Sequence, residues 1–180
     1  MAAARGGRPL GTLVDALATA RIGETFNQYN RSCLRRERLA AYLEARRHAT
    51  VVLVGEAAGY RGARISGLPF TSERQLTGQG PAEASATIVH RVLTELGIED
   101  EVLLWNVVPT HPHEPDRPYT NRRPTFDEVE SSALYLEGVV RGRRVVAVGR
   151  LAQQATGAPY VRHPSHGGGG AFRAGLERLL

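Results

Sequence analysis

Four short apolar runs, separated by stretches of helical periodicity, constrain the fold of this chain more than any other feature. The first three runs are uninterrupted and all four are too short for a buried helix, which is typical of strands in a parallel sheet covered on both faces. We therefore expect strands at Thr50–Val54, Val102–Trp105, Val145–Val148 and Pro159–Arg162. Because strands that alternate with helices form layered α/β domains, the sequence predicts a three-layer α/β/α sandwich with a central, mostly parallel four-stranded sheet.

The segments between these runs have the apolar spacing of amphipathic helices. Helices are predicted over Thr12–Ala20, Leu34–His48, Pro81–Leu96, Thr125 to about Arg141, Gly149–Gln154 and Ala171–Leu180. Residues 55–80 lack periodicity, and a loop of that length in a compact domain is usually functional. We expect an N-terminal tail and short helix over residues 1–30 and a single domain over residues 31–180.

Composition excludes several classes of protein. The single cysteine, Cys33, cannot form an internal disulfide or a metal site built from several thiolates. All 23 basic residues are arginine, so no lysine is available for a Schiff base or a Walker A loop. The net charge of +5 favours a polyanionic partner, and a GC-rich coding bias is the alternative explanation of the arginine excess. No apolar stretch is long enough for a membrane span and residues 1–8 lack a signal-peptide core, so we expect a cytoplasmic protein.

Three polar side chains lie just past three of the predicted strands. Glu56 follows the first strand, Asn106 the second and His163 the fourth. In open parallel sheets, ligands bind in the crevice at the carboxyl ends of the strands. The sequence therefore predicts that these three groups meet at one rim of the sheet.

The motifs around these side chains each have a functional and a structural interpretation. Small residues at Gly55–Gly59 let a backbone approach a ligand, or simply form a tight turn. Phe70, in a loop rich in glycine and proline, can stack on a planar ligand or anchor the loop in the core. The amide of Asn106 can read a nucleobase edge or form an Asx turn. In His163–His166, the serine hydroxyl can hold a phosphate and His163 can stabilise a developing negative charge.

Other candidate sites are weaker. His111 and His113 lack a clear third ligand, so no metal site is predicted. The glycines after His166 are similar to an esterase oxyanion hole, but the chain has no G-x-S-x-G motif. Arg122 and Arg123 are candidate phosphate contacts, or part of a solvated loop.

Taken together, the motifs resemble those of the uracil-DNA glycosylase superfamily. The matching residues are Gly55–Gly59, Gly67–Phe70, Leu103–Asn106 and His163–Ser165, in the family's order. The resemblance implies a uracil-DNA glycosylase-like fold and a monofunctional enzyme that flips a base out of DNA and hydrolyses its N-glycosidic bond in base-excision repair. It implies no cofactor and a DNA partner, single- or double-stranded. We expect no membrane contact and a monomer.

The resemblance also assigns roles to individual residues. Phe70 would stack on the base, Asn106 would read its amide edge, and Glu56 would orient base or water. His163 would stabilise the departing uracil anion. The remaining assignments are Ala57 and Gly59 for the base pocket, and Pro164, Ser165, His166, Gly167 and Arg122 for DNA contact.

The chain departs from the family pattern in three respects. The best-known branch has an aspartate where this chain has Ala57, so the usual water-activating carboxylate is missing. A leucine wedge falls at Gly167, so His166 or Phe172 would have to replace it unless the enzyme prefers single strands. With Cys33 alone, the four-cysteine cluster of the iron–sulphur branch is absent. Two alternatives to uracil excision therefore stay open: a glycosylase for another lesion, such as hypoxanthine or mismatched thymine, and a non-catalytic DNA-binding member of the fold.

Overall fold

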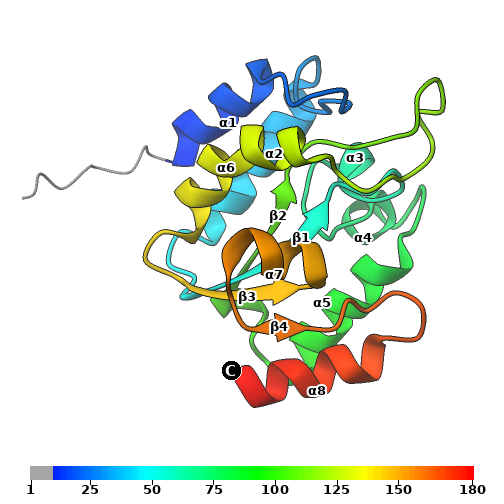
Figure 1. The fold of residues 1–180 in the computed structure, drawn as a ribbon. Helices are drawn as coiled ribbons and strands as arrows, with labels where there is room; N and C mark the ends of the chain where they lie inside the picture. The colour runs from blue at the N-terminus through cyan, green and yellow to red at the C-terminus, as the bar shows by residue number, and fades with distance from the viewer. Residues whose placement is uncertain (1–9) are drawn as a thin grey trace, which may run out of the picture.

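The computed structural model describes residues 10–180, so only the first nine residues of the tail and short helix predicted over residues 1–30 lie outside the described residues. Its centre is a sheet of β1 (Val51–Ala57), β2 (Val102–Val108), β3 (Arg144–Val148) and β4 (Tyr160–Val161) (Figure 1). The strand order is β2-β1-β3-β4, and every neighbouring pair is parallel. The predicted four-stranded parallel sheet is therefore confirmed.

The first two strands are longer than predicted. β1 continues to Ala57 and β2 to Val108, three residues beyond the apolar runs, and the two strands still pair at Gly55↔Asn106 and Ala57↔Val108. The prediction ended each strand at its first polar or glycine residue. The ladder hydrogen bonds continue past those residues, which places Glu56 and Asn106 inside strands rather than in turns.

The six predicted helices are present with shifted ends. They are α1 (Leu10–Thr19), α2 (Cys33–Ala45), α5 (Ala84–Leu96), α6 (Phe126–Val140), α7 (Arg150–Thr156) and α8 (Gly169–Leu179). Two ends differ from the prediction by three residues: α2 ends at Ala45 instead of His48, and α5 does not begin at Pro81. Its N-cap is Glu83, whose backbone is extended (φ −114°, ψ 121°), so the helix begins only at Ala84.

Residues 55–80 were expected to form a loop, and this prediction was incomplete. They include two short helices, α3 (Ala63–Ser66) and α4 (Glu73–Thr77), and a further 3₁₀ turn, η1, covers Glu99–Glu101. Left-handed glycines, Gly67 and Gly78, end α3 and α4. Helices of one turn are too short to show a 3.6-residue period, which explains why the sequence pattern missed them.

Alternate residues of the strands face two separate cores. Val52 and Val54 of β1 pack with α1, α2, α6 and α7, whereas Val51 and Leu53 pack with α5 and α8. Figure 1 shows the two helical layers on opposite sides of the sheet. The three-layer α/β/α architecture is therefore confirmed. Within residues 10–180, no helix has the length and apolarity that a bilayer span requires.

Candidate active site

A pocket of about 500 Å³ lies at the carboxyl ends of the strands, and we call it the rim pocket. Glu56, Asn106 and His163, which come from three different strand ends, all line it. The spatial convergence expected from the sequence is therefore present. Other predicted site residues in its wall are Ala57, Gly59, Phe70, Ser165, His166 and Arg122.

The side-chain amide of Asn106 is held at the wall of the rim pocket by its strand. Asn106 pairs with Gly55 of β1 and is only 4% exposed. Because it lies within β2, the Asx-turn interpretation is wrong. No group among residues 10–180 hydrogen-bonds to its amide, so both the N–H₂ donor and the carbonyl acceptor stay available to a ligand.

Phe70 lies against Gly55, beside Asn106. A Cβ atom built on Gly55 would overlap the Phe70 ring and lie 2.9 Å from Asn106 Oδ1, so the ring occupies space that only glycine leaves open. Phe70 has φ +51°, a left-handed conformation that costs a non-glycine residue about 1–3 kcal/mol. The ring packs in the apolar core and also lines the rim pocket, which combines the anchoring and the ligand-facing interpretations.

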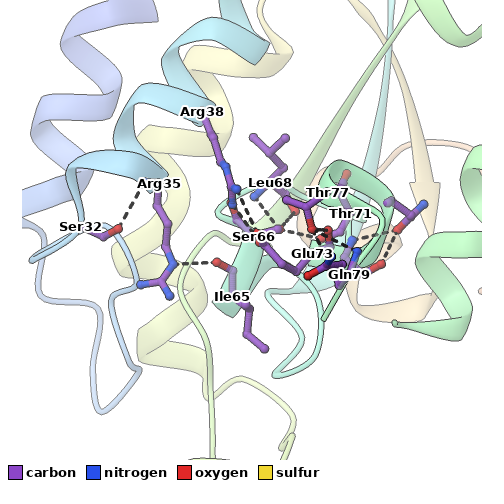
Figure 2. Close-up of polar contacts among 12 residues, drawn as sticks. Ser32, Arg35, Arg38, Ile65, Ser66, Leu68, Thr71, Glu73, Thr77 and Gln79 are labelled. Carbon is purple, nitrogen blue, oxygen red and sulfur yellow. Dashed lines mark hydrogen bonds and ion pairs between the residues drawn. The ribbon is translucent and has the colours of Figure 1, made fainter. Parts of the chain in front are cut away.

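A polar network holds the segment that carries Phe70 (Figure 2). The Arg38 guanidinium pairs with both carboxylate oxygens of Glu73 at 2.8 and 3.0 Å and donates to the Ser66 carbonyl. The Ser66 hydroxyl donates to the Thr71 carbonyl at 2.6 Å, which closes the chain around Phe70. These contacts from α2 and α3 supply the restraint that a strained backbone at Phe70 requires.

Substituting alanine at Gly55 tests this packing. The added methyl group must displace the Phe70 ring, and overpacking of this kind costs about 1–3 kcal/mol. We expect Gly55→Ala to lower the midpoint of urea denaturation. Gly170→Ala is the matched control, because a Cβ there meets no atom within 4 Å and Gly170 lies in α8. Equal midpoints for the two variants would contradict the proposed packing.

Hydrogen bonds define the protonation of His163. The backbone N–H of Ser165 donates to His163 Nδ1 at 3.2 Å, and the Ser165 hydroxyl lies 2.8 Å from the same nitrogen. Because a backbone N–H can only donate, Nδ1 is an acceptor and the proton of the neutral ring is on Nε2. Burial lowers the pKa of His163, and the neighbouring His166 lowers it further. His163 is therefore a neutral N–H donor in the wall of the rim pocket.

Two carboxylates share the rim pocket. Burial raises the pKa of Glu56, an effect that Arg123 partly opposes, and burial alone raises the pKa of Glu83. Glu83 belongs to no motif, so sequence reasoning missed it. It also changes the interpretation of Gly59, because a Cβ at Gly59 would overlap the Glu83 carboxylate. The space beside Gly59 is filled by Glu83 rather than left for a ligand.

Arg122 has a different environment from the one expected of a phosphate contact. Its guanidinium forms two hydrogen bonds to the buried Glu128 carboxylate, at 2.8 and 2.5 Å, and its Nε donates to the His113 carbonyl. These bonds use most of its N–H groups in holding the loop onto α6. In the structure, Arg122 therefore supports the wall of the rim pocket.

Of the two residues suggested as a replacement for the wedge, only one is accessible. Phe172 is fully buried among the apolar side chains of β4, α5 and α8, so the wedge interpretation of Phe172 is wrong. His166 is exposed and has φ +51°, next to the exposed Gly167. Pro164 is buried and does not line the rim pocket.

The two histidines considered for a metal have a structural partner. His111 is buried, and its Nδ1–H donates to the Ala58 carbonyl at 2.8 Å, while its ring stacks on that of His113. This bond fastens the loop after β2 to the end of β1. Within residues 10–180, no group of three or more His, Cys, Asp or Glu side chains has an arrangement that could hold a metal ion.

Comparison with known proteins places these features in one family. The model of the uracil DNA glycosylase superfamily matches residues 43–174. Among solved structures, the crystal structure of wild-type SMUG2 from Pedobacter heparinus aligns with a TM-score of 0.67 and 10% sequence identity. The alignment covers 94% of this chain and 97% of that one, and at this identity it shows a shared fold. No curated protein sequence matches the chain.

Proposed function

The chain belongs to the uracil DNA glycosylase superfamily, and from this premise we propose that it releases uracil from DNA by hydrolysing the N-glycosidic bond. The family supports a DNA glycosylase with DNA as its substrate. The composition of the rim pocket supports uracil as the target base. The aromatic ring of Phe70, the unpaired amide of Asn106 and the neutral imidazole N–H of His163 all line this pocket. The target nucleotide would have to leave the base stack to reach them.

The rim pocket can recognise uracil by shape and by hydrogen-bond polarity. The Phe70 ring offers a face for stacking on a flipped pyrimidine. The Asn106 amide can donate to uracil O4 and accept from N3–H, whereas cytosine presents an amino donor and an unprotonated N3 at the same edge. Because Asn106 is fixed in β2 and free of internal partners, the wrong base would leave its amide unsatisfied.

His163 can supply the largest part of the rate. When the bond between C1′ and the base nitrogen breaks, its electron pair stays on the base, and negative charge develops at O2. The Nε2–H donor of His163, held by the contacts of Nδ1 with Ser165, can stabilise that charge in the rim pocket. Water then adds to C1′, which leaves an abasic site for base-excision repair.

Cleavage of defined oligonucleotides tests the proposal. We expect the full chain to create alkali-sensitive sites in uracil-containing DNA, single- or double-stranded, and to leave the cytosine-containing control intact. Cleavage of hypoxanthine- or thymine-mismatch substrates without cleavage of uracil would contradict uracil as the target while keeping the reaction. Tight binding without cleavage of any substrate would replace the enzyme with a DNA-binding protein.

A further inference from the structure

Glu83 is a second carboxylate in the wall of the rim pocket, beside the turn that follows Ala57. It lies at the start of α5, where its carbonyl accepts the backbone N–H and the hydroxyl of Thr87 at 3.0 and 3.1 Å. Its backbone is therefore anchored by the helix. The side chain contributes nothing to that anchoring.

The carboxylate of Glu83 is not used for capping. An N-cap side chain usually accepts a hydrogen bond from the first turn of its helix, but Glu83 makes no such bond. No side chain or N–H group within residues 10–180 hydrogen-bonds or ion-pairs with it. A half-buried carboxylate in a pocket wall that has no internal partner is costly to maintain, which points to a ligand that it serves.

The surrounding backbone makes room for this carboxylate. A Cβ on Gly59 would overlap Glu83 Oε1, and a Cβ on Gly62 would overlap Oε2. The carboxylate thus fits between two glycines of the turn that leads from β1 to α3. This turn begins two residues after Ala57, the position at which the water-activating carboxylate of the best-known branch is missing.

We propose that Glu83 is the general base that activates the attacking water, and this inference rests on the proposed glycosylase function. The water oxygen bonds to C1′ as the C1′–N bond breaks, and the electron pair of that bond leaves with the base. The water proton passes to the Glu83 carboxylate and from there to solvent. Burial raises the pKa of Glu83, which makes its carboxylate a stronger proton acceptor than one in water.

Glu56 is the competing carboxylate in the rim pocket. It lies on β1 next to Ala57, and burial raises its pKa, an effect that the positive charge of Arg123 partly opposes. No cation influences Glu83 in this way. Burial raises the pKa of both carboxylates, so substituting each in turn separates their roles.

Single-turnover cleavage of uracil-containing DNA by Glu83→Gln, Glu83→Ala and Glu56→Gln tests the inference. General base catalysis contributes about 10²- to 10⁴-fold, so we expect a loss in that range for both Glu83 variants, with unchanged affinity for DNA that carries an abasic-site analogue. Added formate should restore part of the rate of Glu83→Ala, because it can enter the vacated space as a base. Glu95→Gln, an exposed carboxylate on the same helix, is the control and should cleave at the wild-type rate.

The possible outcomes distinguish a failure of the role proposed for Glu83 from a failure of the proposed glycosylase function. If the wild-type chain cleaves no substrate, the proposed function fails and Glu83 loses its role with it. If the wild type and Glu83→Gln cleave at similar rates, the function stands and the inference is overturned. Losses that follow a lowered melting temperature or weaker DNA binding, without rescue by formate, would show a structural role and also overturn it. A large loss of cleavage rate in Glu56→Gln alone would show that Glu56, and not Glu83, is the general base, which also overturns the inference.

Discussion

His163→Ala should lower the single-turnover rate of uracil release by about 10²- to 10³-fold, the usual effect of losing one donor to a developing oxyanion. Affinity for the uncleaved DNA should change little, because the donor matters most when charge has built up on the base. Rates measured with enzyme in excess, beside binding isotherms for a non-cleavable substrate analogue, separate these two effects. Equal losses in rate and affinity would refute a role in the transition state.

The control for His163→Ala is His48→Ala. His48 is exposed and precedes β1, so it lies at the amino end of the sheet, opposite the rim pocket. We expect the His48→Ala variant to cleave uracil-containing DNA at the wild-type rate. Ser165→Ala provides a graded comparison, because it removes the hydroxyl next to Nδ1 but leaves the backbone N–H that fixes the same tautomer. Its rate should therefore fall much less than that of His163→Ala.

The layers of the fold and the meeting of three functional groups could be predicted from the sequence because both depend on strand ends. Apolar runs such as Val51–Val54 indicate buried parallel strands, and the topology of such sheets brings their carboxyl ends together. Glu56, Asn106 and His163 were found by this argument alone. Their exact positions in the strands could not be predicted. Asn106 lies inside β2, and a single amide in the sequence does not indicate that the hydrogen bonds between the strands continue past it.

Features that depend on side chains from distant segments could not be predicted. Glu83 reaches the rim pocket only because Gly59 and Gly62, more than twenty residues earlier, leave space for its carboxylate. The sequence predicts that Arg122 is either a phosphate contact or part of a solvated loop, because an arginine next to prolines in a loop is expected at the surface. Its partner, Glu128, follows Thr125 at the spacing of a capping box, and nothing in that spacing shows that its carboxylate also binds an arginine.

Glu128→Ala should destabilise the fold by about 3–5 kcal/mol, the usual cost of leaving a buried charge without its partner. Glu128 is 1% exposed, and its carboxylate accepts two hydrogen bonds from Arg122 and one from the Thr125 backbone N–H at 2.9 Å. Its removal takes the shared acceptor from two N–H groups of Arg122 and from the backbone N–H of Thr125, the N-cap of α6. Urea denaturation at pH 7 measures the loss.

Glu137→Ala is the matched control, because Glu137 lies on the same helix and pairs with Arg141 at the surface. Exposed pairs of this kind contribute roughly 0–1 kcal/mol, so a comparable loss in both variants would contradict the special role of Glu128.

The stabilisation by Glu128 should also depend on pH. Burial would raise the pKa of Glu128, but the hydrogen bonds from Arg122 and Thr125 outweigh it and hold the pKa below 4.5. The stabilisation is therefore complete above about pH 4.5 and is lost as the pH falls through the lowered pKa, so wild type and Glu128→Ala should converge in acid.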